Sequence, residues 1–252
     1  DNTPERLGVW LDALWDKRTR NRDAVDYMIL TLLLGARRSE TAQLVWRDRL
    51  LAEGLKEADY SVLTLPDGDG VGQVTFRGTK SGAMHSMPLG RFATWLMRQR
   101  QQDYPDHLFV FPSSSKNPAT TSPHYNSPRE FVASLRTTLE RQSLQKAWDA
   151  YATAFKAKGQ QPPMTLEQFA QPYPPQWKFT MHDLRRTFCT VAVNTEGMPY
   201  AVVQQLMNHS QMGNVTARYG KPTKEALRKH MQELENELLR YAAALPQIQM
   251  EG

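Results

Sequence analysis

Cysteine and long apolar runs are nearly absent from this 252-residue chain. Cys189 is the only cysteine, which excludes an internal disulfide and any zinc site built on cysteine pairs, as is usual in a reducing compartment. No segment reaches about 18 consecutive apolar residues. The first residues also lack the basic region followed by an apolar stretch that is typical of a signal peptide. We therefore expect no membrane span and no signal peptide.

Motifs for metals and nucleotides are also missing. The six histidines show no His-Glu-x-x-His spacing, and residues 67–72 resemble a calcium loop only until Val71 replaces an oxygen ligand and Gly78 the final Glu. The same glycine-rich stretch precedes an expected strand, so it is not a phosphate loop. Ser113–Lys116 matches Ser-x-x-Lys but lies in an expected loop without companion motifs. We expect no metal and no cofactor.

The composition is that of a folded, moderately basic protein. Hydrophobic residues make up 40% of the chain, and 31 Lys and Arg outnumber 26 Asp and Glu, for a net charge of +5. Residues 176–224 alone hold six cations and two anions, a surplus of four. Such a concentration is typical of a surface that faces nucleic acid through phosphate contacts.

Periodicity predicts an α+β fold that is predominantly α-helical. Short alternating runs at residues 60–65, 71–77 and 84–89 predict one small three-stranded antiparallel sheet. Five prolines make residues 160–175 irregular. We expect a single domain over 1–252 with helices at residues 4–17, 22–34, 39–46, 90–102, 128–157, 182–195, 199–207, 213–219 and 223–243.

Three polar stretches stand out as candidate sites. Gly35–Glu40 places Arg37 and Arg38 between two helices, where an anion would meet guanidinium groups and backbone N–H groups together. Residues 182–186 place His182 and Arg185 on one helical face. Taken singly, the first stretch also fits a solvated turn and the second an ordinary amphipathic helix start.

The third stretch is Leu206–Ser210, which contains His209 and is followed by Tyr219. Alone, these two residues also fit structural roles. In this order, however, the three stretches resemble the catalytic domain of the tyrosine recombinases, the bacteriophage integrase family. The resemblance covers about residues 4–225 and rests on Arg37, Lys80, His182, Arg185, His209 and Tyr219.

The sequence departs from the family pattern in three places. Asn208 replaces the usual Gly before the His, and Tyr219 follows His209 by ten residues where nine is common. Residues 112–177 form a longer stretch than the family needs, and we interpret it as an insertion. The resemblance also implies a DNA-clamping domain upstream of the catalytic domain, and we expect residues 1–252 to be the catalytic domain without it.

The residue types suit the cleavage of a phosphodiester. Arg37 and Arg185 would clamp the phosphate, because guanidinium groups match its geometry and stay charged, and His209 would add a hydrogen bond. Tyr219 would be the nucleophile.

Proton transfers would complete the cleavage. A phenol has a pKa of about 10, so Tyr219 needs help, which nearby arginines and His182 as general base would supply. By resemblance, Lys80 would protonate the departing 5′ oxygen.

The resemblance implies a site-specific recombinase that cuts and rejoins DNA through a covalent 3′-phosphotyrosyl intermediate. Its setting would be a phage or mobile element in the bacterial cytoplasm, associated with the nucleoid. Its partners would be double-stranded DNA and further copies in a tetrameric synapse. Two alternatives stay open: a type IB topoisomerase-like enzyme that relaxes DNA, and a non-catalytic DNA-binding module.

The last expected helix, residues 223–243, has an apolar stripe. This stripe is formed by Leu227, Met231, Leu234, Leu238 and Tyr241. Its length is under three heptads, so packing on a domain is favoured over a free coiled coil. By resemblance, the helix would dock on a neighbouring subunit.

Overall fold

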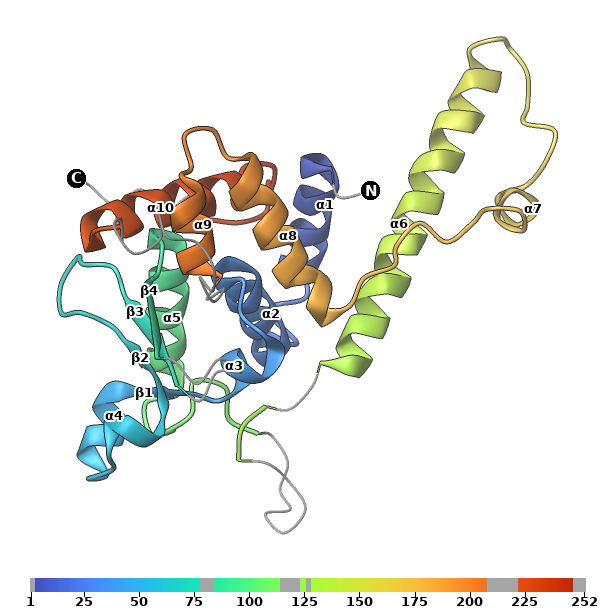
Figure 1. Cartoon of the computed structure of the whole chain (residues 1–252). Helices are drawn as coiled ribbons and strands as arrows, with labels where there is room; N and C mark the ends of the chain where they lie inside the picture. The colour runs from blue at the N-terminus through green and yellow to red at the C-terminus, as the bar shows by residue number, and fades with distance from the viewer. Residues whose placement is uncertain (1–2, 78–83, 114–122, 126–127, 208–221, 247–252) are drawn as a thin grey trace. The chain divides into compact units, whose positions relative to one another are not determined.

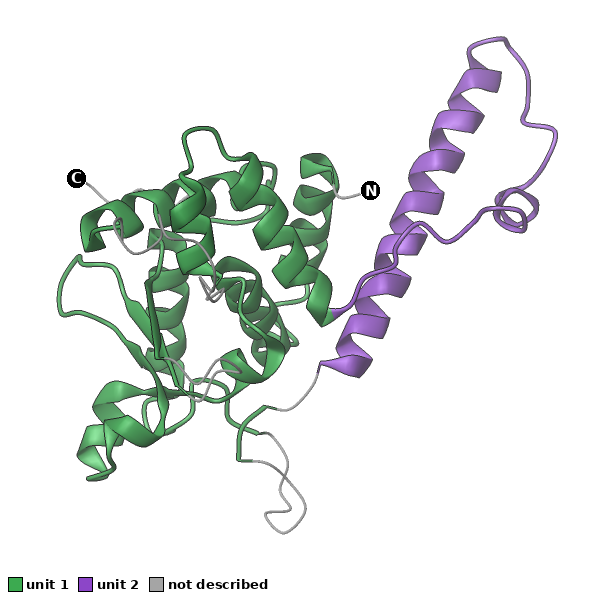
Figure 2. Cartoon of the chain, in the orientation of Figure 1, with its two compact units in different colours: residues 1–127, 181–252 green, residues 128–180 purple. Residues whose placement is uncertain are grey.

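The computed structural model describes residues 3–77, 84–113, 123–125, 128–207 and 222–246. The chain divides into two compact units (Figure 2): residues 1–127 together with 181–252 form one, and residues 128–180 form the other. Figure 1 labels the elements. Among the described helices, none is both long and apolar enough to cross a membrane.

The first unit is built around α2 (Arg22–Leu34), in which every residue from Ala24 to Leu34 is buried. Helix α8 packs along it, and α10 contacts both α8 and α1. These long helices were predicted by periodicity and are confirmed within a few residues. Besides α2, the α-helices of this unit are α1 (Pro4–Trp15), α3 (Arg38–Ala42), α4 (Arg47–Ala52), α5 (Arg91–Asp103), α8 (Met181–Asn194), α9 (Tyr200–Leu206) and α10 (Lys224–Leu239).

The prediction of a three-stranded antiparallel sheet is wrong. The sheet has four strands in the order β1 (Leu44–Trp46), β2 (Ser61–Thr64), β3 (Gln73–Phe76) and β4 (His85–Pro88). Strand β1 pairs in parallel with β2, while the other two pairings are antiparallel, so the sheet is mixed.

The added strand comes from a segment that periodicity assigned to a helix over residues 39–46. Leu44–Trp46 is buried throughout and therefore shows no alternation, and three residues are too few to distinguish a strand from a helix. Tertiary pairing decides: besides its ladder with β2, Trp46 N–H donates to Leu108 O at 2.9 Å and Val110 N–H to Leu44 O at 2.9 Å. Helix α3 accordingly ends at Ala42.

The second unit consists of α6 (Arg129–Lys156), α7 (Leu166–Ala170) and a returning segment. Helix α7 lies in the stretch predicted to be irregular; Thr165 begins it by accepting a hydrogen bond from Gln168 N–H. Its Phe169 packs on the rings of Trp148 and Tyr151 of α6, with centroids 5.7 and 5.2 Å away. The interpretation of residues 112–177 as an insertion stays a prediction, and the helix expected at 213–219 lies outside the described residues.

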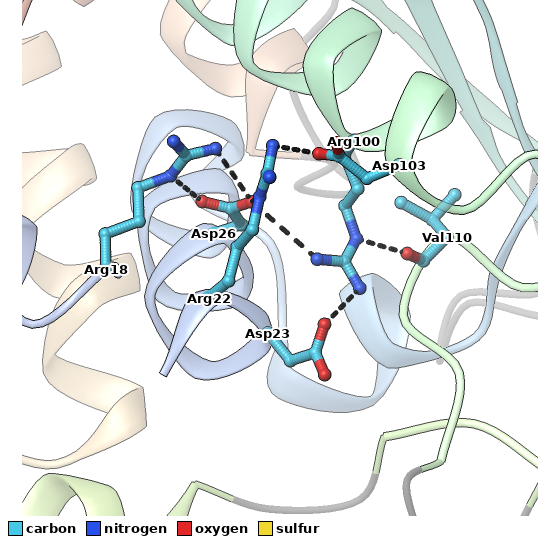
Figure 3. A network of polar contacts seen from close by, with 7 residues as sticks. All are labelled: Arg18, Arg22, Asp23, Asp26, Arg100, Asp103 and Val110. Carbon is cyan, nitrogen blue, oxygen red and sulfur yellow. Dashed lines mark hydrogen bonds and ion pairs between the residues drawn. The ribbon is translucent and has the colours of Figure 1, made fainter. Parts of the chain in front are cut away.

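A buried guanidinium holds α5 against α2 (Figure 3). Arg100 is fully buried, and its Nη2 lies 2.7 Å from Asp23 Oδ1 while its Nε donates to Val110 O at 2.5 Å. Its Nη1 lies 3.7 Å from Asp26, which also pairs with Arg18 at 2.6 Å. Two helices and the segment beside β1 are thereby connected through one side chain.

Helix α10 docks on the same chain through a buried carboxylate. Glu235 accepts hydrogen bonds from the backbone N–H groups of Phe92 and Ala93, at 2.8 and 2.9 Å, and so caps the N-terminus of α5. The four stripe residues from Leu227 to Leu238 are buried, whereas Tyr241 is exposed. Docking of α10 on another subunit stays a prediction.

Because Glu235 is buried, we expect the free energy of unfolding to depend on pH. Burial raises the pKa of this carboxyl above its ordinary value of 4.5, and the hydrogen bonds from Ala93 and Phe92 only partly oppose that shift. The folded state therefore holds the proton more tightly than the unfolded state. Its contribution to the free energy of unfolding is full below pH 4.5 and is lost as the pH rises through the raised pKa.

We expect this loss to disappear in Glu235→Gln, which does not titrate. Urea unfolding followed by circular dichroism between pH 4 and 7 measures the difference between wild type and variant. The matched control is Glu233→Gln on the same helix, where the side chain is 38% exposed. Parallel pH profiles for wild type and Glu235→Gln would contradict the assignment.

Candidate functional site

The candidate site forms where α2 ends against α8. Gly35 closes α2 in the left-handed conformation, with φ 55° and ψ 22°. A Cβ at this position would lie 2.4 Å from the ring of Phe188, which is fully buried on α8. Two features therefore require glycine at position 35: the left-handed backbone conformation and the close approach of α8.

This close approach brings the guanidinium of Arg185 to the end of α2, because Arg185 lies one helical turn before Phe188. Its Nη1 donates to Gly35 O at 2.6 Å and its Nη2 to Met207 O at 2.7 Å. A guanidinium has five N–H donors, so these contacts fix its plane and still leave donors for an anion. Arg185 thus connects the ends of α2 and α9.

Arg37 stands two residues beyond Gly35, at the start of α3. Its backbone N–H and its Nη1 donate to the two carboxylate oxygens of Glu40, each at 2.7 Å. From the buried side, the hydroxyl of Tyr27 donates to Arg38 O at 2.6 Å, and burial raises the pKa of that phenol. The Arg37 side chain is 40% exposed, so an anion from solution can reach it.

The electrostatics of the pair favour an anion. Burial lowers the pKa of Arg185, the nearby charge of Arg37 lowers it further, and Glu40 and Cys189 oppose the shift. A guanidinium nevertheless stays protonated at any working pH. Two cations against one carboxylate leave a partly desolvated positive charge, which a phosphate group would neutralise.

The other predicted site residues are placed only in part. His182 is exposed in the first turn of α8, three residues before Arg185 and on the same helical face. Lys80, His209 and Tyr219 lie outside the described residues. The structure therefore brings Arg37 and Arg185 together, and the gathering of the remaining groups stays a prediction.

The predicted basic surface over residues 176–224 also stays a prediction. Lys178 belongs to the second unit, while Arg218 and Lys221 lie outside the described residues. Arg186 is exposed and pairs with Asp183 at 3.3 Å. Within the described ranges, no group of three or more His, Cys, Asp or Glu side chains is placed to hold a metal ion.

Sequence reasoning missed two residues of this region, Glu40 as the partner of Arg37 and His85. His85 is buried at the start of β4, and its Nε2 lies 3.2 Å from Leu206 O. Burial and the charge of Arg185 lower its pKa, although the Leu206 hydrogen bond and Glu40 oppose this. The alternation of residues 84–89 places His85 on the same face as Met87, a signal that could have revealed a buried histidine.

Comparison with known proteins gives one match. The family model described as the phage integrase family matches residues 11–226. This range contains all six polar positions identified in the sequence. No curated protein and no solved structure matches the chain.

The requirement for glycine at position 35 is testable against an internal control. Gly54 also has a positive φ, of 70°, but a Cβ there would meet nothing within 4 Å. We expect Gly54→Ala to lower the free energy of unfolding by about 1–2 kcal/mol, the cost of the left-handed backbone alone. Gly35→Ala adds the collision with Phe188, for a loss of about 2–5 kcal/mol. Urea denaturation measures both, and equal losses would argue against the close approach of α8.

Proposed function

Because the chain belongs to the phage integrase family, whose members are tyrosine recombinases that bind DNA, we propose that it is a site-specific recombinase acting through a covalent 3′-phosphotyrosyl intermediate. The observation that carries this proposal is the proximity of Arg37 and Arg185 at the end of α2. These residues come from distant parts of the chain, yet the charge of one lowers the pKa of the other.

The two arginines would act on the scissile phosphate. Charge builds up on the non-bridging oxygens as the phosphorus is attacked, and fixed cations stabilise that charge more than the ground state. Arg185 is held in advance by the carbonyl groups of Gly35 and Met207, and Arg37 by Glu40. Little reorganisation is then needed when the phosphate arrives. His209 would donate a further hydrogen bond to the phosphate.

Tyr219 would supply the nucleophile. Its oxygen attacks the phosphorus, the bond to the 5′ oxygen breaks, and the 3′ phosphate becomes esterified to the phenol. The phenolic proton passes to His182, and Lys80 gives a proton to the departing 5′ oxygen. Attack by the 5′ hydroxyl of another strand reverses these steps and rejoins the DNA. The phosphotyrosyl bond keeps the free energy needed for religation.

The test of this chemistry is a trapping experiment. On a nicked duplex that loses its 5′ product, wild type is expected to accumulate a covalent protein–DNA complex. Tyr219→Phe should bind the same duplex but form no complex, because it lacks the attacking oxygen. Denaturing gels and peptide mapping of the modified residue measure the outcome. A covalent complex that persists in Tyr219→Phe would show that another residue is the nucleophile.

Relaxation of supercoiled plasmid without a defined site would instead favour the topoisomerase-like alternative. DNA binding by wild type without any covalent complex would favour the non-catalytic module.

A second prediction concerns the clamp. Arg37→Ala should slow formation of the covalent complex by about 10²–10³-fold, the usual effect of removing one charge-stabilising donor, with little change in DNA affinity. Arg37 is preferable to Arg185 for this test, because Arg185 also holds two backbone carbonyls. Arg49→Ala is the matched control, since it removes an arginine that pairs at 3.4 Å with the exposed Asp106. If Arg37→Ala weakened only binding, the clamp assignment would be wrong.

A further inference from the structure

His85 lies close enough to Arg185 and Glu40 for their charges to act on it. It begins β4, directly after the stretch that carries Lys80. The ring is buried and stacks on Phe76 of β3, with centroids 6.2 Å apart and an interplanar angle of 15°. The last pair of the β3–β4 ladder, Phe76 with His85, therefore holds the imidazole in one orientation.

The ring is directed at the C-terminal end of α9. Its Nε2 lies 3.2 Å from Leu206 O, and because a carbonyl only accepts, Nε2 must carry the proton. The next carbonyl, that of Met207, accepts from Arg185. The last carbonyls of a helix have no partner within the helix, so two side chains from β4 and α8 satisfy two consecutive ones here.

The chain continues from Met207 directly into the segment that contains His209 and Tyr219. We propose that His85 is a positioning residue for strand cleavage, whose Nε2–H bond to Leu206 O fixes the end of α9 and, through the neighbouring Met207 carbonyl, the guanidinium of Arg185. This inference rests on the proposed recombinase function.

The charges around His85 help to determine its protonation state in the fold. Glu40 of α3 and Arg185 of α8 are the charged groups that act on it, and Phe76 and Leu206 provide the ring and the carbonyl. Because burial and Arg185 lower its pKa below 6.5, the neutral ring is the favoured form in the fold. Its stabilising contribution is full above pH 6.5 and is lost as the pH falls through the lowered pKa, when His85 becomes a further cation near Arg185.

The experiment compares two variants of the full chain. His85→Leu removes the donor, while His85→Gln keeps an N–H that can reach Leu206 O but does not titrate. Three quantities are measured: the rate of covalent complex formation on the nicked duplex, the affinity for the same duplex, and amide hydrogen exchange over residues 203–207. His124→Gln, at a half-buried histidine on a different segment, is the control.

We expect His85→Leu to form the complex about tenfold more slowly, the effect of one hydrogen bond, with unchanged affinity and faster exchange at the end of α9. His85→Gln should restore the rate and the exchange. The control should match wild type.

Three results would overturn the inference. One is an unchanged rate in His85→Leu while wild type forms the complex. Another is a His85→Gln variant as slow as His85→Leu, since ring packing on Phe76 would then be what matters. The third is unchanged amide exchange over residues 203–207 in His85→Leu. This result tests the contact between His85 and α9 even if wild type forms no covalent complex and the proposed function is wrong.

Discussion

The approach of α8 to the carbonyl end of α2 is the constraint on which the candidate site depends. Gly35 ends α2, makes room for Phe188 and accepts a hydrogen bond from Arg185, three roles that only a residue without a side chain can combine. The contact joins groups 150 residues apart in the sequence. Since Arg37 follows Gly35 by two residues, any displacement of α8 would separate the two guanidiniums.

Buried or half-buried charges that bind backbone groups occur at three junctions of the first unit. Arg100 donates to Val110 O, Arg185 to Gly35 O and Met207 O, and Glu235 accepts from the N-terminus of α5. A charge taken out of water is costly unless it is fully hydrogen-bonded, so each of these side chains tolerates only a narrow geometry. Apolar packing brings the helices together, and these polar contacts determine their exact register.

The sequence predicted those parts of the molecule that depend on local pattern. The long periodic helices α2, α8 and α10 and the glycine after α2 were found, because amphipathic spacing and helix termination are visible within a few turns. Strand β1 was missed because three buried residues have no period, and its partners Ser61–Leu63 and Leu108–Val110 come later in the chain. At the site, the order of motifs identified Arg37 and Arg185. The roles of Glu40 and His85 depend on tertiary contacts that no local pattern carries.

The charges of the described site also suggest how it would recognise its substrate. Arg37 and Arg185 carry two positive charges, Glu40 carries one negative charge, and the lowered pKa of His85 keeps its ring neutral above pH 6.5. A phosphodiester bears a single negative charge, so its arrival makes this cluster neutral. A positive charge at His85 would be the third in the cluster and would leave it positive again. The neutral ring of His85 therefore adds no charge to this cluster.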